Sequence, residues 1–246
     1  MTLPLFELET VTKRLGLSAV LRDVTFRVEP CESILLLGNN GAGKTTLLRV
    51  LSGLMRPSVG RLLFRGQPYG LAGAALRRAI GLIGHESRLY GDLTAAENLR
   101  LFGELYGVTE LAGRIEAALA RVRLEHVPDI PVRALSSGMT KRVALARLLI
   151  CEPEVLLLDE PHTGLDQLSL AVLDGILADF RKRGATLIMT THQFTPRTEA
   201  FGRVLILHRG RLVYNRTEDR PGPERCMQLL AQHAPETGNA SGMAAP

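Results

Sequence analysis

The chain has 246 residues, 46% of them hydrophobic and 22% charged, which is typical of one globular domain or of a core with a small inserted lobe. The formal net charge of +5 would favour acidic surfaces such as anionic lipid or nucleic acid, but so weak an excess decides nothing. We expect no nucleic-acid partner. The longest apolar runs, such as 34–37 and 155–158, are far shorter than the roughly 20 residues that span a bilayer. Glu7 and Glu9 argue against a signal peptide, so we expect a cytosolic protein that meets a membrane only through a partner.

The first third of the chain is predicted to consist mainly of strands. Apolar and polar residues roughly alternate over 6–11 and 21–28, which predicts two strands with one buried face each. The continuous apolar run 33–37 predicts a parallel strand that is buried on both faces. The other elements predicted here are one helix and two strands, at 43–54, 60–66 and 80–84.

The middle of the chain has helical patterns. Thr94 and Glu97 form a capping box that opens an amphipathic helix. A second helix is expected around 115–122, and a third from about 137 to 151. We expect these helices to form a lobe, roughly residues 86–150, inserted into a wound α/β core.

Strands return in the last third of the chain. They are expected at 155–158 and 186–191 with a helix between them, and 203–214 reads as a hairpin that turns at Arg209-Gly210. Beyond about residue 220 the periodicity is lost. We therefore expect one domain over 1–220 and a disordered tail over 221–246.

The strongest motif is the phosphate-loop pattern at 38–45, between a predicted strand and a predicted helix. Its glycines allow backbone N–H groups to form an anion-binding nest at the positive end of that helix. Lys44 can reach the β- and γ-phosphates of a nucleotide, and the Thr45 hydroxyl can ligate Mg²⁺. The nucleotide-binding residues expected here are Gly38, Asn39, Asn40, Gly41, Ala42, Gly43, Lys44, Thr45 and Thr46.

Two acidic residues follow the apolar run 155–158. After a phosphate loop, Asp159 is expected to hold Mg²⁺ through water, and Glu160 to polarise the attacking water. Consecutive residues at a strand end point in different directions, so one can serve the metal and the other the water. Together the two motifs predict a phosphate-loop ATPase or GTPase.

Four further segments resemble, in order, the motifs of ATP-binding cassette (ABC) proteins. The resemblance runs from about Phe6 to Tyr214 and implies a phosphate-loop NTPase core of class α/β: a mostly parallel sheet with flanking helices, an N-terminal antiparallel β part and an inserted helical lobe. The segments are the Q-loop region (80–98), the signature (135–139, continued at 141–147), the Walker B motif with the D-loop (159–166) and the H-loop (190–192).

The resemblance also implies a mechanism. Two cassettes, identical or related, would face each other with ATP between them, and Ser136, Ser137 and Gly138 of one would cap the γ-phosphate held by the other. His192 is similar to the family's switch histidine, which contacts that phosphate and supports the base, here Glu160. Asp166 would couple the two sites across the interface.

The sequence departs from the family pattern at several positions. His85 stands where the Q-loop usually has glutamine; it can take over catalysis and metal binding there, or be a solvated loop residue. Leu15 replaces the usual aromatic ring beside adenine, so base stacking should be weak. In the signature, Ser137 replaces glycine and Met139 replaces glutamine.

The resemblance favours the ATP-hydrolysing subunit of a membrane transporter, bound peripherally to permease subunits at the cytoplasmic face of the inner membrane. The alternatives are a soluble ABC ATPase without a transport role and a non-hydrolysing binding module. Residues 84–90, with the signature, resemble bacterial cassettes that export haem for cytochrome c maturation. Drugs, lipids and polysaccharides remain alternative cargoes.

Three apolar residues, Leu89, Tyr90 and Leu93, stand in a segment that otherwise reads as a surface loop. In the ABC family this segment receives the coupling helix of the membrane subunit. The same residues can instead cover the first helix of the lobe.

Overall fold

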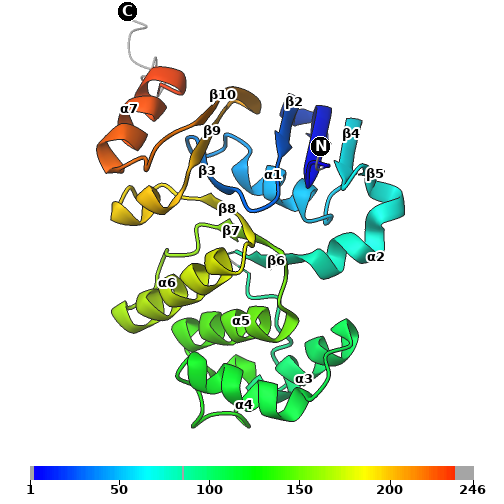
Figure 1. The fold of residues 1–246 in the computed structure, drawn as a ribbon, viewed down its shortest axis with the longest axis vertical. Coiled ribbons are helices and arrows are strands. Elements are labelled where there is room, and N and C mark those ends of the chain that lie inside the picture. The colour runs from blue at the N-terminus through cyan, green and yellow to red at the C-terminus, as the bar shows by residue number, and fades with distance from the viewer. Residues whose placement is uncertain (1–2, 85, 236–246) are drawn as a thin grey trace, which may run out of the picture.

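The computed structural model describes residues 3–84 and 86–235. Within them, one sheet has the strand order β10-β9-β3-β8-β7-β6 and a second has the order β2-β1-β4-β5. The fold class expected from the sequence is confirmed (Figure 1). The strands are β1 (Phe6–Leu15), β2 (Ser18–Val28), β3 (Ser33–Leu37), β4 (Val59–Phe64), β5 (Gln67–Pro68), β6 (Ile80–Ile83), β7 (Val155–Asp159), β8 (Thr186–Thr190), β9 (Arg203–His208) and β10 (Arg211–Thr217).

The helices cover the faces and one end of these sheets. The turn between β9 and β10 falls at Arg209-Gly210, as predicted. The helices are α1 (Lys44–Leu51), α2 (Tyr69–Ala79), α3 (Ala95–Tyr106), α4 (Leu111–Arg121), α5 (Ser137–Cys151), α6 (Gln167–Lys182) and α7 (Pro223–His233), with the short 3₁₀ turns η1 (Val132–Ala134) and η2 (Pro196–Ala200).

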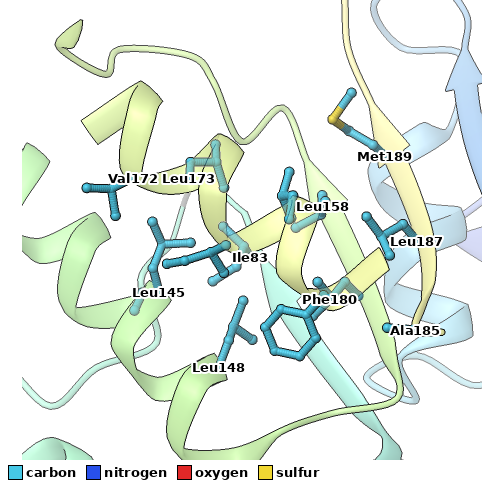
Figure 2. Close-up of a cluster of buried hydrophobic side chains, with 14 of the residues drawn as sticks. Ile83, Leu145, Leu148, Leu158, Val172, Leu173, Phe180, Ala185, Leu187 and Met189 are labelled. Atoms are coloured by element: carbon cyan, nitrogen blue, oxygen red, sulfur yellow. The ribbon is translucent and has the colours of Figure 1, made fainter. Parts of the chain in front are cut away.

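Strand β3 lies inside the larger sheet, parallel to β8 on one side and β9 on the other. Because side chains alternate along a strand, its two faces feed two cores. Leu35 and Leu37 pack with α5 and α6, whereas Ile34 and Leu36 pack with α1, α2 and the antiparallel sheet. Figure 2 shows the first of these cores, where Phe180 of α6 and Leu145 of α5 meet strand residues such as Leu158. This two-sided burial explains why the strand has no polar alternation.

Helices α3, α4 and α5 follow one another between β6 and β7 and lie together at one end of the molecule (Figure 1). The predicted capping box is present: Thr94 accepts from the Glu97 backbone N–H, and the Glu97 carboxylate accepts from that of Thr94. Arg142 of α5 is buried and donates to the carbonyls of Val122 and Arg123 at the end of α4. This contact satisfies carbonyls that the helix end leaves unpaired.

The disordered tail predicted after residue 220 is wrong for 223–233, which form α7. Pro223 begins the helix, and Cys226 and Leu229 bury one narrow face of it. Tyr214 of β10 contacts His233 with ring centroids 4.7 Å apart. Residues 236–246 of the predicted tail lie outside the described residues.

Candidate functional site

The phosphate loop joins β3 to α1 and is packed tightly against the two neighbouring hairpins. Gly38 has φ +147°, and a Cβ there would lie 2.4 Å from the carbonyl oxygen of Leu207 in β9. Gly43, the N-cap of α1, has φ +107°, and its Cβ would lie 2.9 Å from the carbonyl oxygen of Val20 in β2. Both positions therefore require glycine, for their backbone angles and for the lack of space.

Lys44 lies within this loop as a buried cation. The residue is 7% exposed, and its Nζ donates to the carbonyls of Gly38 (2.6 Å) and Asn39 (3.2 Å). Burial lowers the pKa of Lys44, and the nearby carboxylates of Glu160 and Asp159 partly offset this effect. The loop thus holds a cation that is weakly hydrated and close to the Walker B acids, as binding of a polyphosphate requires.

Asp159 ends β7 opposite Thr190, its partner at the end of β8. The Thr190 hydroxyl donates to Asp159 Oδ1 (2.7 Å) and accepts from the backbone N–H of Glu160 (3.0 Å). Thr190 is completely buried and orients both acidic residues. The sequence did not predict that Thr190 orients the two acids. Its position at the end of the parallel strand next to Asp159 was the signal that could have indicated this role.

Glu160 and His192 lie side by side, as the resemblance to the ABC family implied. Glu160 Oε2 is 3.1 Å from His192 Nδ1, and the carboxylate side chain is 15% exposed while the imidazole is 49% exposed. Glu160 also has φ +50°, a left-handed backbone conformation that is costly for a non-glycine residue. The pair therefore combines a shielded carboxylate with an imidazole that is open to an incoming group.

A cavity of about 640 Å³ adjoins the loop, and none of the described residues that line it is acidic. Its volume is suited to a small ligand, and its lining of backbone N–H groups, imidazoles and a guanidinium is suited to an anion. The C-terminal helix reaches this cavity: Asn39 Nδ2 donates to the carbonyl of Ala234 (2.9 Å). The lining residues are Gly38, Asn39, Asn40, Gly41, Ala42, Thr191, His192, Phe194, His208, Arg209, Leu230 and Pro235.

A smaller cavity of about 60 Å³ is lined by Thr45 and Asp159, together with Glu86 and Arg88. A hydroxyl and a carboxylate are the hard oxygen donors that Mg²⁺ prefers, so the side chains present fit this ion. His85, the third metal ligand and catalytic residue expected from the sequence, lies outside the described residues.

Residues 21–163 match the family model described as ABC transporter. This match covers more than half of the chain and both nucleotide motifs. The chain belongs to the ABC transporter family.

Among curated relatives, the cytochrome c biogenesis ATP-binding export protein CcmA of Cupriavidus necator is 40% identical over 177 residues, 72% of this chain and 78% of that protein. The Nod factor export ATP-binding protein I of Cupriavidus metallidurans is 34% identical over 211 residues, 85% of this chain and 70% of that protein. The resemblance to the cytochrome c subgroup is therefore confirmed, while the presence of both kinds of exporter leaves the cargo open.

Solved structures agree with this assignment. An ATP-binding subunit of an ABC transporter superposes with a TM-score of 0.80 at 32% identity, covering 87% of this chain and 90% of that one. The cassette MJ0796, solved as a dimer in a post-hydrolysis state bound to ADP and Pi, superposes with a TM-score of 0.76 at 25% identity, covering 86% of this chain and 98% of that one. This chain is the ATP-binding subunit of an ABC transporter and an ATPase.

The signature of this ABC subunit lies apart from its own phosphate loop. Ser136 is the N-cap of α5 and accepts from the backbone N–H of Met139 (3.2 Å). Ser136 and Ser137 are exposed. Because α5 packs on the opposite face of the sheet from α1, the structure does not bring the signature and the phosphate loop of one chain together.

Two other expected residues have different surroundings. Asp166 is the N-cap of α6, where it accepts from the Ser169 backbone N–H (2.7 Å). Leu15 ends β1 and is 45% exposed. Its weak stacking on adenine stays a prediction.

A groove of about 490 Å³ separates the core of the ABC subunit from its helical lobe. Leu89 and Tyr90 line it, and Tyr90 is 56% exposed, whereas Leu93 is half-buried and lies outside the lining. Among the described residues of the lining, the charged ones are Arg77, Arg88 and Arg147. Arg147 donates to the carbonyls of Arg88 (3.1 Å) and Leu82 (3.3 Å) and lies over the ring of Phe102, so it shapes the groove floor.

The segment that carries Tyr90 is held by Asn98 of α3, which is completely buried. The Asn98 side-chain amide donates to the carbonyls of Tyr90 (2.9 Å), Leu93 (3.2 Å) and Thr94 (3.0 Å), and its Oδ1 accepts from the Tyr90 backbone N–H (2.8 Å). The Asn98 side chain thus binds the backbone of this segment at three residues, in addition to the backbone bonds that Leu93 and Gly91 accept from Val132 and Arg133.

Replacing Asn98 by alanine is expected to lower the free energy of unfolding by about 1–3 kcal/mol, because the backbone N–H of Tyr90 would lose its partner, while the carbonyls of Tyr90, Leu93 and Thr94 keep backbone donors. Urea unfolding followed by circular dichroism measures this change. Glu104→Ala, at an exposed position on the same helix, is the matched control and should change stability little. A loss below about 0.5 kcal/mol for Asn98→Ala would show that the loop is held by other contacts.

Proposed function

We propose that this ATP-binding subunit drives an exporter, and that the residues around Lys44 carry out Mg²⁺-dependent ATP hydrolysis. The observation that carries the proposal is the single cluster in which a buried ammonium faces Asp159 and Glu160, with His192 paired to Glu160. This arrangement combines a phosphate-binding cation, a metal-binding acid and a base shielded from bulk water.

Each side chain has a distinct task in this proposal. Lys44 and the backbone N–H groups of 38–46 bind and orient the phosphates, and Glu160 accepts a proton from the attacking water. His192 holds the Glu160 carboxylate in place and contacts the γ-phosphate through its exposed edge. Bound at Thr45 and Asp159, Mg²⁺ would neutralise phosphate charge, and the Thr190 hydroxyl keeps the Asp159 carboxylate turned toward that position. His85 remains a proposed contributor to catalysis and metal binding.

The site is proposed to be completed by a second cassette, either another copy of this chain or a related subunit. Ser136, Ser137 and Gly138 are presented at the N-terminus of a long helix, where backbone N–H groups and the helix dipole favour an anion. Since they lie across the sheet from their own phosphate loop, the phosphate they cap is held by the facing subunit. Asp166 would then lie at that interface.

The arginine-lined groove is proposed to receive a cytoplasmic helix of a membrane permease, which places this subunit at the cytoplasmic face of the inner membrane. Among the described residues, no helix is both long and apolar enough to cross a membrane. Charge complementarity favours a permease helix that brings a carboxylate to Arg77 and Arg88 beside an apolar side chain for Tyr90. Haem for cytochrome c maturation is the cargo that we propose first, because the CcmA relatives are among the most similar.

The experiment that tests this proposal is purification of the tagged chain from membranes of its own host, followed by identification of the membrane protein that accompanies it. We expect a permease and, for haem as cargo, a loss of haem-stained c-type cytochromes when the chain is deleted. Recovery of the chain without any membrane protein would contradict the exporter, and normal c-type cytochromes would contradict the haem cargo.

Tyr90→Ala is expected to release the subunit from membranes, because an aromatic anchor in a groove commonly contributes on the order of 2 kcal/mol or more to binding, about a thirtyfold loss in affinity. ATP binding should persist, since Tyr90 lies outside the nucleotide cavities. Sedimentation of cells that express subunit and permease together measures the bound fraction.

Met227→Ala is the control for this experiment, because Met227 is a comparably exposed apolar residue (49%) on α7, away from the groove. If Tyr90→Ala, Leu89→Ala and the double variant all sediment like the parent, the docking surface lies elsewhere.

A further inference from the structure

A buried histidine lies just beyond the Walker B acids. His162, in the loop between β7 and α6, has a side chain that is 11% exposed, and its Nε2 is 3.4 Å from Asp174 Oδ1 of α6. Burial lowers the pKa of His162, an effect that Asp174 partly offsets. The buried Nε2 makes no hydrogen bond of good geometry among the described residues, and the Asp174 carboxylate is the acceptor that it faces.

Asp174 has a second partner on a different segment. Its Oδ2 is 2.7 Å from Arg197 Nε, in the turn η2 that follows the His192 loop. Asp174 itself lies on a helix whose neighbouring residues Leu173, Ile176 and Leu177 are buried in the core. Asp174 therefore has a position set by α6, and it contacts two loops, one that carries Glu160 and one that carries His192.

The contacts of Asp174 and the Glu160–His192 pair together form a closed circuit of contacts between the two loops and α6. Glu160 Oε2 meets His192 Nδ1 at 3.1 Å on one side, and His162 and Arg197 meet the two oxygens of Asp174 on the other. Short stretches of backbone connect Glu160 to His162 and His192 to Arg197. A movement of either loop relative to α6 is therefore expected to change the Glu160–His192 distance or a contact to Asp174.

A cavity of about 180 Å³ lies against His162, Asp174 and Arg197, and it is large enough for the ring to shift or for water to enter. On its other wall, Arg181 is held over the ring of Phe201 at 5.0 Å. The Arg197–Asp174 ion pair and the contact of His162 with Asp174 thus connect both loops to α6.

We propose that Asp174 is a positioning residue for ATP hydrolysis: through His162 and Arg197 it sets the distance between Glu160 and His192. This inference rests on the roles proposed above for Glu160 and His192. Half-exposed ion pairs contribute little to global stability, whereas a displacement of about 1 Å in a catalytic group can cost about a hundredfold in rate. The consequence of losing Asp174 should therefore appear in turnover rather than in folding.

The test is Asp174→Asn in the full chain, measured as ATPase activity against ATP concentration. We expect kcat to fall about tenfold, with KM for ATP within about twofold of the parent and a thermal midpoint close to that of the control. The control is Asp179→Asn, which breaks an ion pair of similar exposure on the same helix, Asp179 Oδ2 to Arg121 Nη2 at 2.8 Å, and should leave kcat unchanged.

Two further variants complete the test. Arg197→Ala should lower kcat as Asp174→Asn does, with no further loss in the double variant, whereas Arg197→Lys should recover part of the rate by retaining the charge. A kcat within twofold of the parent, or a loss that appears in KM instead, overturns the proposal. If Asp174→Asn unfolds more readily than the control, Arg197→Ala is used instead. A kcat of Arg197→Ala within twofold of the parent, or a loss that appears in KM, then overturns the proposal.

The two proposals fail in distinguishable ways. If Glu160→Gln is inactive while Asp174→Asn and Arg197→Ala retain the parental kcat, only the positioning role is overturned. If Glu160→Gln retains the parental rate, the roles proposed for the catalytic pair are overturned first and the positioning role with them.

Discussion

Replacing Lys44 by alanine is expected to abolish ATP binding while leaving the fold intact. The ammonium is the one charged group inside the described part of the phosphate loop, and it donates to the Gly38 and Asn39 carbonyls. Hydrogen bonds to charged groups contribute about 1.5–3 kcal/mol each, so losing two such bonds to phosphate corresponds to a decrease in affinity of roughly 10² to 10⁴.

The stability of Lys44→Ala should change much less than its affinity. Burial already disfavours the charged ammonium, as the lowered pKa of Lys44 shows, so its removal also removes a desolvation cost. Titration calorimetry with Mg²⁺-ATP and thermal unfolding without nucleotide measure the two quantities. Lys182→Ala, at an exposed position in the last turn of α6, is the control. Binding within tenfold of the parent would place the phosphates elsewhere.

The parts of the site that could be predicted from the sequence are those whose interacting residues all lie within one short segment. The phosphate loop is such a segment, because its glycines, Lys44 and Thr45 act within one strand–helix turn. The capping box at Thr94 and the hairpin turn at Arg209 are local in the same sense. For these features, neighbouring residues in the sequence are neighbours in space.

Contacts between distant segments could not be predicted in this way. Thr190 orients Asp159 because β7 and β8 are adjacent in the sheet. Asp174 of α6 contacts two loops that are distant from each other in the sequence, for example at Arg197. The signature is a further case, since its partner is expected on another chain. Helix α7 was not predicted because only Cys226 and Leu229 are buried, which gives a weak helical pattern. Helix α2 was not predicted because Gly70 and Gly73 weaken its helical pattern. Its buried residues do follow that pattern; they are Ala72, Leu76 and Ala79.

Glu160→Gln is expected to lower kcat by about 10² to 10⁴ while ATP binding is retained. The amide has the shape of the carboxylate and can still accept from His192, but it cannot take a proton from water. The Glu160 backbone should keep its left-handed conformation, because its N–H donates to the carbonyl (3.2 Å) and hydroxyl (3.0 Å) of Thr190 in either case. Only the proton-accepting function is removed.

Because hydrolysis is blocked after ATP is bound, this variant should accumulate as a dimer with nucleotide between the subunits. Phosphate release measures the rate, and size-exclusion chromatography with Mg²⁺-ATP measures the dimer. Glu154→Gln is the matched control, since Glu154 directly precedes β7 and pairs with Arg65 far from the phosphate loop. A Glu160→Gln protein that hydrolyses ATP at the parental rate would remove Glu160 from the role of base. Among the described residues, the next candidate to accept the proton would then be His192, whose imidazole lies 3.1 Å from the Glu160 carboxylate and is the more exposed of the two.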